Sequence, residues 1–384
     1  MECRPCIAFL AATLAACQET SPLPAVQPGA APPAALAPAT SNSSPPPEAS
    51  PSTPPSTPPS TPPGPARLTA KLLPLPGANG PAFLDYLVYE RAHERVWVPV
   101  GSTGSVDVLD IANNTFSRID GFKTAERVTE GGKTRTLGPS AAAVGDGFAY
   151  VGNRASNEVC PIDVRTLKSF KCLKLATGTD GVAYVAATKE VWVTTPKNQT
   201  LTVLDASKPS ALALKTTIKT DGAPEGYAVD EAHGLFFTNL EDKGGTVVFD
   251  VKTHKVKETW NPNCDATGPR GIAFDPAHNF AIVACTDHVQ VLDAAHDGAL
   301  LGKLDAGAGI DNIDCVDGKV YIAAGKASKL TVASIDEKGQ LTVVATGDSS
   351  DGARNAVADA KGNAYVADSM GGRLLVFPVA KTQP

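Results

Sequence analysis

A short apolar strand pattern recurs seven times between Arg67 and the C-terminus, and it limits the folds open to this chain. Each copy pairs a strand rich in Val, Tyr and Trp with an alternating apolar run that ends in Asp in six of the seven copies. These residues are Asp110, Asp163, Asp205, Asp250, Asp293 and Asp336, spaced 53, 42, 45, 43 and 43 residues apart. Such a period, with turn residues between alternating runs, is typical of units of about four short antiparallel strands. The repeats predict an all-β fold, a seven-bladed β-propeller of four-stranded antiparallel blades.

The two ends of the repeat region indicate how the ring closes. The last copy ends at Phe377 after three recognisable strands, whereas residues 67–77 precede the first complete copy and resemble the fourth strands of other copies. We therefore expect this N-terminal strand to join the last blade and cover its open edge. The extra length of the first repeat falls in residues 121–138, which we expect to form a polar loop on one face.

Two recurring polar residues are interpreted as turn residues. The carboxylate of each strand-end Asp can accept backbone N–H bonds in the turn toward the fourth strand. His93, His233 and His278 occupy equivalent turns between first and second strands, on different blades. Because these histidines recur in corresponding positions, we expect turn chemistry there and not a metal site.

The Tyr-Val strand, the Asp that ends the third strand and the spacing near 43 residues resemble the YVTN-repeat, YncE-like seven-bladed propellers of bacterial envelopes, over residues 67–384. Residues 359–368, DAKGNAYVAD, also resemble the NHL and gluconolactonase-like propellers. The resemblance implies the fold and an envelope location. Propellers of this shape include ligand-binding scaffolds, lactonases, lyases and electron-transfer modules, so the fold alone does not give the function.

The N-terminal sequence predicts export and membrane anchoring. Residues 1–16 place Arg4 before a short apolar run and end in small residues, the order found in signal peptides. Leu14-Ala15-Ala16-Cys17 resembles the lipobox of bacterial lipoproteins, which implies that Cys17 is lipidated and begins the mature chain. The residue after Cys17 is Gln18 and not Asp, which resembles lipoproteins that are sent to the outer membrane. We expect an exported protein, lipid-anchored in the bacterial cell envelope at the outer membrane or facing the periplasm.

Residues 17–66 are expected to form a disordered tether behind the lipid. Seventeen of the 32 Pro lie in residues 21–66, where Glu48 is the one charged side chain. This composition has too few apolar side chains to offset the entropy of ordering, and Pro favours extended conformations. No later segment approaches the roughly 20 apolar residues of a membrane span. We therefore expect a monomeric propeller, residues 67–384, held at a membrane by its lipid.

The composition and the absence of certain motifs disfavour several classes of function. The net charge is −6, from 34 Lys+Arg and 40 Asp+Glu without a basic cluster, which disfavours nucleic acid as a partner. Downstream of the signal peptide there is no Cys-x-x-Cys pair, and the chain has no Gly-x-Ser-x-Gly elbow or Gly-rich phosphate loop. No sequence motif therefore assigns haem, a nucleotide or a serine nucleophile.

Five cysteines remain after export and lipidation. Cys160 and Cys172 lie on successive strands of one hairpin, so they can face each other at disulfide distance. Cys264 lies in the loop entering the fifth blade, and Cys285 lies where the second strand of that blade returns to the same face. In an oxidising compartment we expect both pairs to form disulfides, which leaves Cys315 as a buried thiol.

A set of polar residues is predicted at one end of the central channel. In a propeller the innermost strands line the channel, and the loops that enter them form one face. Alignment of the repeats places the following residues at these entries: Asp85, Ser140, Asp180, Glu225, Arg270, Asp311 and Arg354, with Asn312 and Asn355 directly after two of them. Four acids and two arginines near one opening predict a small-ligand or cation site. The alternative is a set of solvated side chains that pair with one another.

Two classes of function remain open. The favoured one is a non-catalytic scaffold without a cofactor, which uses this face and residues 121–138 to hold a protein, glycan or small ligand. The other is a gluconolactonase-like hydrolase, in which Glu225, Asp180, Asp311 and Asn355 bind a divalent cation such as calcium that polarises a lactone or ester carbonyl. We favour the scaffold because no motif fixes the ligand spacing, and no catalytic residue is assigned.

Overall fold

The structure is a computed structural model that describes residues 64–128, 131–265 and 268–378. The chain divides into two units, Met1–Thr61 and Pro62–Pro384, and the described residues all belong to the second. The predicted signal peptide, the lipidation site Cys17 and the tether up to residue 63 lie outside the described residues. Within the described ranges, no helix is long and apolar enough to cross a lipid bilayer.

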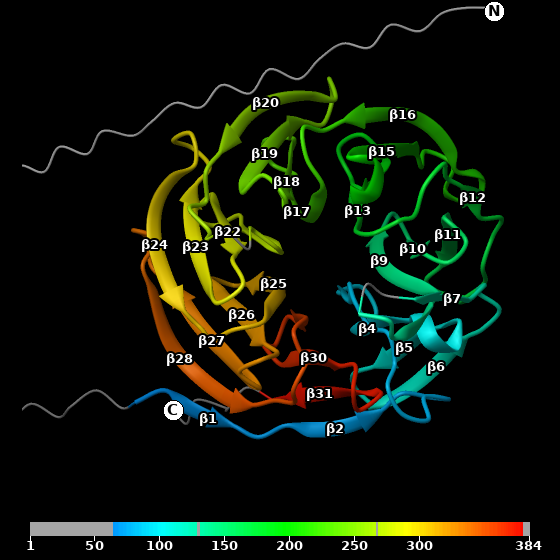
Figure 1. Cartoon of the computed structure of the whole chain (residues 1–384), viewed down its shortest axis with the longest axis horizontal. Coiled ribbons are helices and arrows are strands. Elements are labelled where there is room, and N and C mark those ends of the chain that lie inside the picture. Colours follow the sequence, from blue (N-terminus) through cyan, green and yellow to red (C-terminus); the bar gives the residue numbers. More distant parts are fainter. Residues whose placement is uncertain (1–63, 129–130, 266–267, 379–384) are drawn as a thin grey trace, which may run out of the picture. The chain divides into compact units, whose positions relative to one another are not determined.

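Seven sheets stand around a central axis, which confirms the predicted seven-bladed propeller (Figure 1). Each blade begins with its innermost strand. The first three blades are β3 (Val88–Glu90), β4 (Arg95–Val100), β5 (Ser105–Asp110) and β6 (Thr115–Ile119); β9 (Pro139–Gly145), β10 (Phe148–Asn153), β11 (Glu158–Asp163) and β12 (Leu173–Lys174); and β13 (Val182–Val185), β14 (Glu190–Thr195), β15 (Thr200–Asp205) and β16 (Ala213–Lys219).

The remaining four blades continue around the ring in chain order. They are β17 (Pro224–Asp230), β18 (Leu235–Leu240), β19 (Gly245–Asp250) and β20 (Lys255–Trp260); β21 (Ile272–Asp275), β22 (Phe280–Ala284), β23 (His288–Asp293) and β24 (Ala299–Asp305); β25 (Ile310–Val316), β26 (Lys319–Ala324), β27 (Lys329–Ile335) and β28 (Leu341–Asp348); and β29 (Ala356–Ala358), β30 (Ala364–Asp368), β31 (Arg373–Phe377) and β2 (Lys71–Pro74). Short 3-10 turns, η1 (Gly101–Thr103), η2 (Pro196–Asn198) and η3 (Pro209–Ala211), connect some strands.

Burial changes from the middle of a blade to its outer edge. All six residues of β14 are buried, because blades on both sides cover a middle strand. The outer strand β16 has no buried residue and shows alternation between exposed and half-buried positions. Large aromatic residues such as Trp192 and Phe236 fill the space between neighbouring blades, with ring centroids 4.6 Å apart. The Val-, Tyr- and Trp-rich segments recognised in the sequence are therefore core strands.

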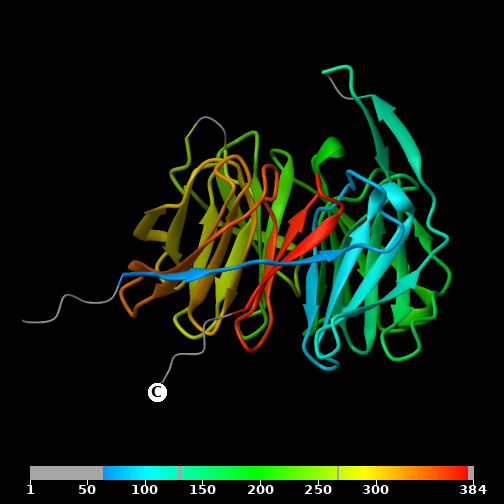
Figure 2. The ribbon, with the colours of Figure 1, turned by 90° about the horizontal axis from the view of Figure 1, so that it is seen from below.

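The N-terminal segment closes the ring, as predicted. β2 pairs antiparallel with β31, from Lys71 opposite Val376 to Pro74 opposite Arg373. The innermost strands of the seventh and first blades, β29 and β3, also lie in contact. One feature was not predicted: β1 (Ala66–Leu68) pairs in parallel with β28 and makes the sixth blade five-stranded. Figure 2 shows this segment crossing the outside of two blades.

The strand-end aspartates act as turn residues, which confirms their interpretation. Asp250 Oδ1 accepts hydrogen bonds from the backbone N–H groups of Lys252 at 3.1 Å and Thr253 at 2.7 Å. Asp163 accepts from Arg165 and Thr166 in the same way. These bonds lower the pKa of both carboxyl groups, mainly through the backbone and side-chain donors of Thr253 and Thr166.

The recurring histidines also make local turn contacts. His233 Nδ1 lies 2.6 Å from Asp230 Oδ2, and His278 Nδ1 lies 2.7 Å from Asp275 Oδ2, three residues earlier in each case. His93 contacts Glu90 in the same way. The prediction of turn chemistry is confirmed for all three.

Both predicted disulfides are present. Cys160 and Cys172 lie with Cα atoms 4.1 Å apart, next to the register in which β11 pairs with β12. Cys264 and Cys285 lie with Cα atoms 5.4 Å apart. Cys315 is a free thiol, but it is half-buried and not fully buried as predicted, because the end of β25 lies partly open to solvent.

Residues 121–138 differ from the predicted loop. They contain β7 (Ala125–Val128) and β8 (Thr134–Leu137), which pair antiparallel as a two-stranded sheet of their own. Figure 2 shows this hairpin standing out beyond the blades. Alternating Thr, Arg and Val side chains favour the extended conformation, which explains why strands form here.

Candidate functional site

The predicted entry residues lie together around one end of the channel, which is called the mouth below. Backbone hydrogen bonds link neighbouring entries, such as Tyr86 N to Ser140 O at 2.9 Å and Gly271 N to Asp311 O at 3.0 Å. Gly271 permits this approach, because a Cβ atom at that position would lie 2.5 Å from the Asp311 carbonyl oxygen. The same pattern, a polar residue followed by Gly, occurs at Asp180 and Glu225.

Three mouth acids are paired with arginine. Arg154 contacts Asp85, with Nη2 3.0 Å from Oδ2, and also contacts Asp180. Arg354 Nε lies 3.0 Å from Asp311 Oδ2. Of these contacts, only the one between Arg354 and Asp311 joins two of the predicted mouth residues, and all three acids are buried, unlike the solvated side chains of the alternative.

The remaining predicted residues have different roles. Arg270 contacts Glu241, which the sequence interpretation missed. Asn355 donates from Nδ2 to the backbone oxygen of Asp85 at 3.1 Å, and its Oδ1 accepts from Asn312 N at 3.2 Å. Asn355 therefore links neighbouring entries and holds their backbones in place. Ser140 is buried, and its hydroxyl has no hydrogen-bond partner among the described residues.

Glu225 is the exception among the mouth acids. Within the described part of the chain, its carboxyl group makes no hydrogen bond or ion pair, although the side chain is half-buried and lines a cavity. Burial raises the pKa of Glu225 to about 8, with smaller contributions from the neighbouring carboxylates of Asp311 and Asp85. Burial also raises the pKa of Asp311, which the Arg354 guanidinium partly offsets. Glu225 is therefore largely protonated at neutral pH.

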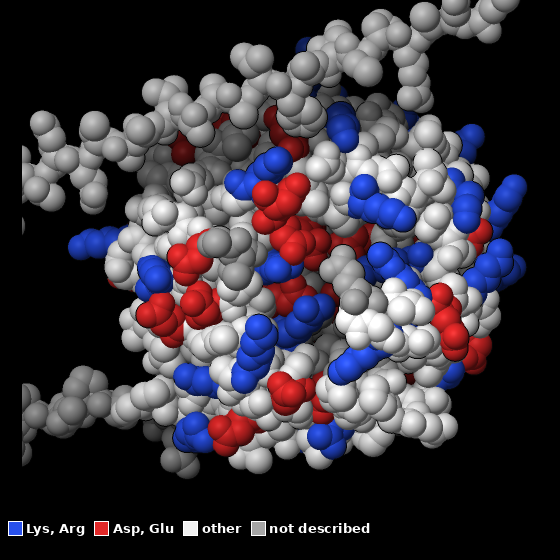
Figure 3. Space-filling view, viewed as in Figure 1, with Lys and Arg blue, Asp and Glu red and all other residues white. Residues whose placement is uncertain are grey.

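A polar cavity of about 610 Å³ opens at the mouth. It is lined by Asp85, Arg127, Leu137, Arg154, Asn157, Ala176, Thr177, Gly178, Thr179, Asp180, Pro196, Lys197, Asn198, Glu225 and Arg354. Figure 3 shows acidic side chains at the centre of this face with Lys and Arg side chains close to them. The volume suits a small ligand or one side chain of a larger partner.

The hairpin and the loops after second strands add residues that the sequence interpretation missed. Arg127 of β7 lines the cavity, and the Arg135 guanidinium of β8 lies 3.9 Å from the centre of the Phe83 ring. Burial lowers the pKa of Arg135, and the nearby Arg354 charge adds to the effect. Arg154 and Glu241 directly follow second strands. The repeat alignment, extended to the loops after those strands, would have placed both on this face.

Beneath the mouth, the channel becomes aromatic and apolar. Tyr86 and Tyr227 stack across it with ring centroids 5.6 Å apart, and both line a second cavity of about 360 Å³. Burial raises the pKa of Tyr86, and among charged neighbours Glu225 contributes most to the shift. The Tyr86 hydroxyl is therefore electrostatically coupled to the Glu225 carboxyl group.

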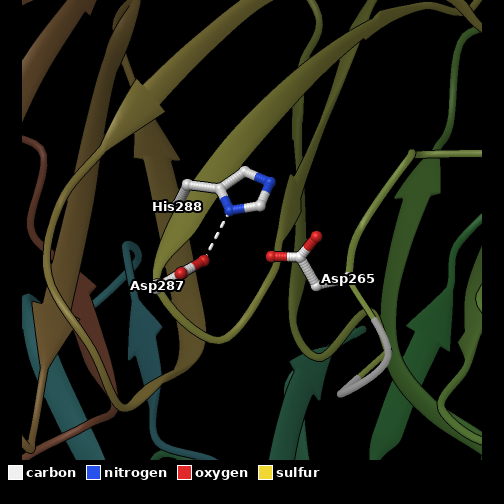
Figure 4. A group of neighbouring side chains, drawn as sticks. All are labelled: Asp265, Asp287 and His288. Atoms are coloured by element: carbon white, nitrogen blue, oxygen red, sulfur yellow. Dashed lines mark hydrogen bonds and ion pairs between the residues drawn. The ribbon is translucent and has the colours of Figure 1, made fainter.

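The mouth carboxylates do not form a compact cation site in the described ranges. The one group of three or more His, Cys, Asp or Glu residues whose ligand atoms lie within 4.8 Å of one another there is Asp265, Asp287 and His288 (Figure 4). This group lies on the fifth blade, next to the Cys264–Cys285 disulfide that brings its two segments together. His288 is buried, with Nδ1 2.5 Å from Asp287 Oδ1, whereas both Asp residues are exposed. The calcium ligands considered from the sequence, Glu225, Asp180, Asp311 and Asn355, are not part of it.

No protein-family model and no curated protein sequence matches the chain. Solved structures do. A chain of the mitotic checkpoint complex matches with a TM-score of 0.65 at 15% identity, over 85% of this chain and 97% of that one. Kuenenia stuttgartiensis hydrazine synthase matches at 0.62 and 15%, over 80% and 99%. The WD40 repeats of RRP9 match at 0.64 and 10%, over 80% and 97%. At such identities these likenesses show the propeller fold alone.

Proposed function

We propose that this chain is an exported, lipid-anchored envelope protein of the YVTN-repeat, YncE-like type, whose propeller is a non-catalytic binding scaffold. The observation that carries the binding role is the polar cavity at the mouth, about 610 Å³ in volume and lined by charged groups from several blades. Arg154 contacts two acids of this cavity, Asp85 and Asp180, and Arg354, which also lines it, contacts Asp311.

Two further observations support export and anchoring. The described residues contain two disulfides, which form and persist in oxidising compartments. The sequence Leu14-Ala15-Ala16-Cys17 supplies the lipidation motif. In a bacterium that processes lipoproteins, the full chain is expected in the membrane fraction, and the Cys17→Ser chain in the soluble envelope fraction. Equal distribution of the two chains would contradict lipid anchoring.

The binding role is tested with fractions of an envelope extract. Proteins, glycans and small molecules are separated, and the melting temperature of the full-length chain is measured in each. A ligand at about 100 times its Kd stabilises the chain by about 2.7 kcal/mol, so one fraction is expected to raise the melting temperature. A rim variant, Arg127→Gln with Lys197→Gln, is expected to lose most of this shift, whereas Lys338→Gln on an exposed turn keeps it. No shift in any fraction, or an equal shift in the rim variant, would reject the proposal.

A metal-dependent lactonase is the second candidate, and the Glu225 carboxyl group is the observation that favours it. A carboxyl that holds a proton near neutral pH and lines a cavity can act as a general acid. The candidate ranks lower, because Asp180 and Asp311 are engaged with arginines and Asn355 is bonded to the backbone. Lactone hydrolysis that needs a stoichiometric divalent ion and is lost in Glu225→Gln would reverse this order.

A further inference from the structure

Within the described residues, one mouth acid is not paired with an arginine, although Arg127, Arg154, Lys197 and Arg354 line the cavity around it. Asp85, Asp180 and Asp311 each contact an arginine, but no such contact is present for Glu225 within the described ranges. Asp311, Asp85 and Glu241 disfavour ionisation of the Glu225 carboxyl group, whereas Arg154 favours it. Arg354, which lines the same cavity, also interacts electrostatically with Glu225. Arg154 is already shared between two other carboxylates. A cation brought in by a ligand can therefore pair with the Glu225 carboxyl group when that group gives up its proton.

We propose that the mouth binds a protonated primary amine, whose ammonium group pairs with Glu225. This inference rests on the proposed binding function and names the ligand class for it. An ammonium group has three N–H donors and needs hydrogen-bond acceptors around it. The Glu225 carboxylate offers two oxygens. Thr179 lines the same cavity and is only 1% exposed, yet its hydroxyl has no hydrogen-bond partner among the described residues.

Surrounding groups favour an organic cation over a metal ion. In the described part of the chain, the mouth carboxylates do not form a group of three His, Cys, Asp or Glu ligand atoms within 4.8 Å of one another. Leu137, Ala176 and Pro196 add apolar surface to the cavity for an alkyl chain.

Binding of the amine is expected to depend on pH in a defined way. Because the pKa of Glu225 is about 8, roughly a tenth of the molecules carry the ionised carboxylate at pH 7 and roughly nine tenths at pH 9. A lysine-type amine, with a pKa of about 10.4, stays protonated over this range. The apparent affinity is therefore expected to rise about tenfold from pH 7 to pH 9, and binding at pH 7 is expected to release close to one proton.

The probe is N-acetyl-lysine methylamide, added to the purified full-length chain and followed by calorimetry in two buffers with different protonation enthalpies. N-acetyl-norleucine methylamide is the uncharged match. We expect the lysine probe to bind, to release a proton and to gain affinity at pH 9, and the norleucine probe to be silent. Glu225→Gln is expected to weaken binding at least tenfold at pH 9 and to abolish proton release. Glu337→Gln, at an exposed turn, serves as the matched control.

Pentylamine separates two sources of the ammonium group. If it binds as tightly as the lysine probe, a free amine is sufficient, and if only the lysine probe binds, the ligand is a lysine side chain of a polypeptide. Absence of lysine-probe binding at millimolar concentration, or equal binding to Glu225→Gln, would overturn the inference. If the amine fails while an envelope fraction still gives a melting shift that the rim variant loses, the binding function stands without this ligand class. If that shift is absent too, both proposals fall.

Discussion

Single residues at the mouth have different electrostatic surroundings although they occupy equivalent positions. Asp311 and Glu225 both begin inner strands, yet Asp311 contacts Arg354 and Glu225 contacts no cation in the described ranges. The difference follows from which residue stands at the next entry along the ring. Arg354 follows Asp311 at the next entry, whereas Arg270, next to Glu225, turns to Glu241.

Glu225→Gln is expected to change the pH dependence of stability. The folded pKa of about 8 lies above the ordinary value of 4.5, so the folded chain keeps a proton that the unfolded chain loses. The free energy of unfolding that depends on protonation of Glu225 is highest below pH 4.5, and it falls until the pH has risen through 8. Gln carries no such loss. In urea unfolding, the variant is therefore expected to gain stability relative to the wild type between pH 5 and pH 9, and Glu337→Gln is expected to show no change.

Asp250→Ala tests the turn residues. The Asp250 carboxylate holds two backbone N–H groups, and its loss is expected to cost about 1 kcal/mol of unfolding free energy at pH 7. Because the pKa of Asp250 lies below 3.8, this stabilisation is present above 3.8 and is lost as the pH falls through the lowered value. The urea midpoints of variant and wild type should therefore converge in acid. A constant difference down to pH 2 would argue against the turn role.

Contacts other than the hydrogen bonds between blade strands also hold the loops around the mouth. The disulfide between Cys264 and Cys285 ties the loop entering β21 to the end of β22. The hairpin β7–β8 has two strands only. Its strand β8 contacts η1, and the Arg135 guanidinium lies over the ring of Phe83 in the segment before β3. Stability of the face around the mouth therefore rests partly on connections between loops.

Removing the Cys264–Cys285 disulfide is expected to destabilise the fifth blade. The bond closes a segment with a sequence separation of 21 residues, and loop-closure entropy predicts a loss of about 3 kcal/mol. The measurement is the urea midpoint of Cys264→Ser with Cys285→Ser, compared with the wild type. Cys315→Ser, which removes the free thiol, is the control. A double variant as stable as the wild type would show that the bond does not constrain the unfolded chain.

At the scale of the whole molecule, the ring is held closed by its own N-terminal segment. β2 completes the seventh blade, and β1 adds to the sixth, so one short segment joins two blades. Its Leu68, Leu73 and Leu75 side chains are buried. The open edge of β31 would otherwise present unpaired backbone groups to solvent.

Two truncated chains are expected to show which N-terminal residues the stability of the propeller requires. A chain that starts at residue 64 keeps β1 and β2, and its melting temperature should equal that of the full chain. A chain that starts at residue 76 loses the burial of Leu68, Leu73 and Leu75, at about 1.5 kcal/mol or more each, and it should melt lower and aggregate. Differential scanning calorimetry and light scattering give both readouts. Equal melting of the two truncated chains would show that ring closure does not need this segment.

The sequence by itself determined the number of blades, the position of the closing strand, the turn Asp and His residues and both disulfides. Each of these depends on a repeat or on contacts within one blade, so spacing along the chain was sufficient. Only the tertiary structure decided which charges meet at the mouth. Arg154 reaches Asp85 from 69 residues away, and Glu225 is left without a cation. Distances of a few ångströms between blades depend on how the closed ring packs, and no local pattern carries that information.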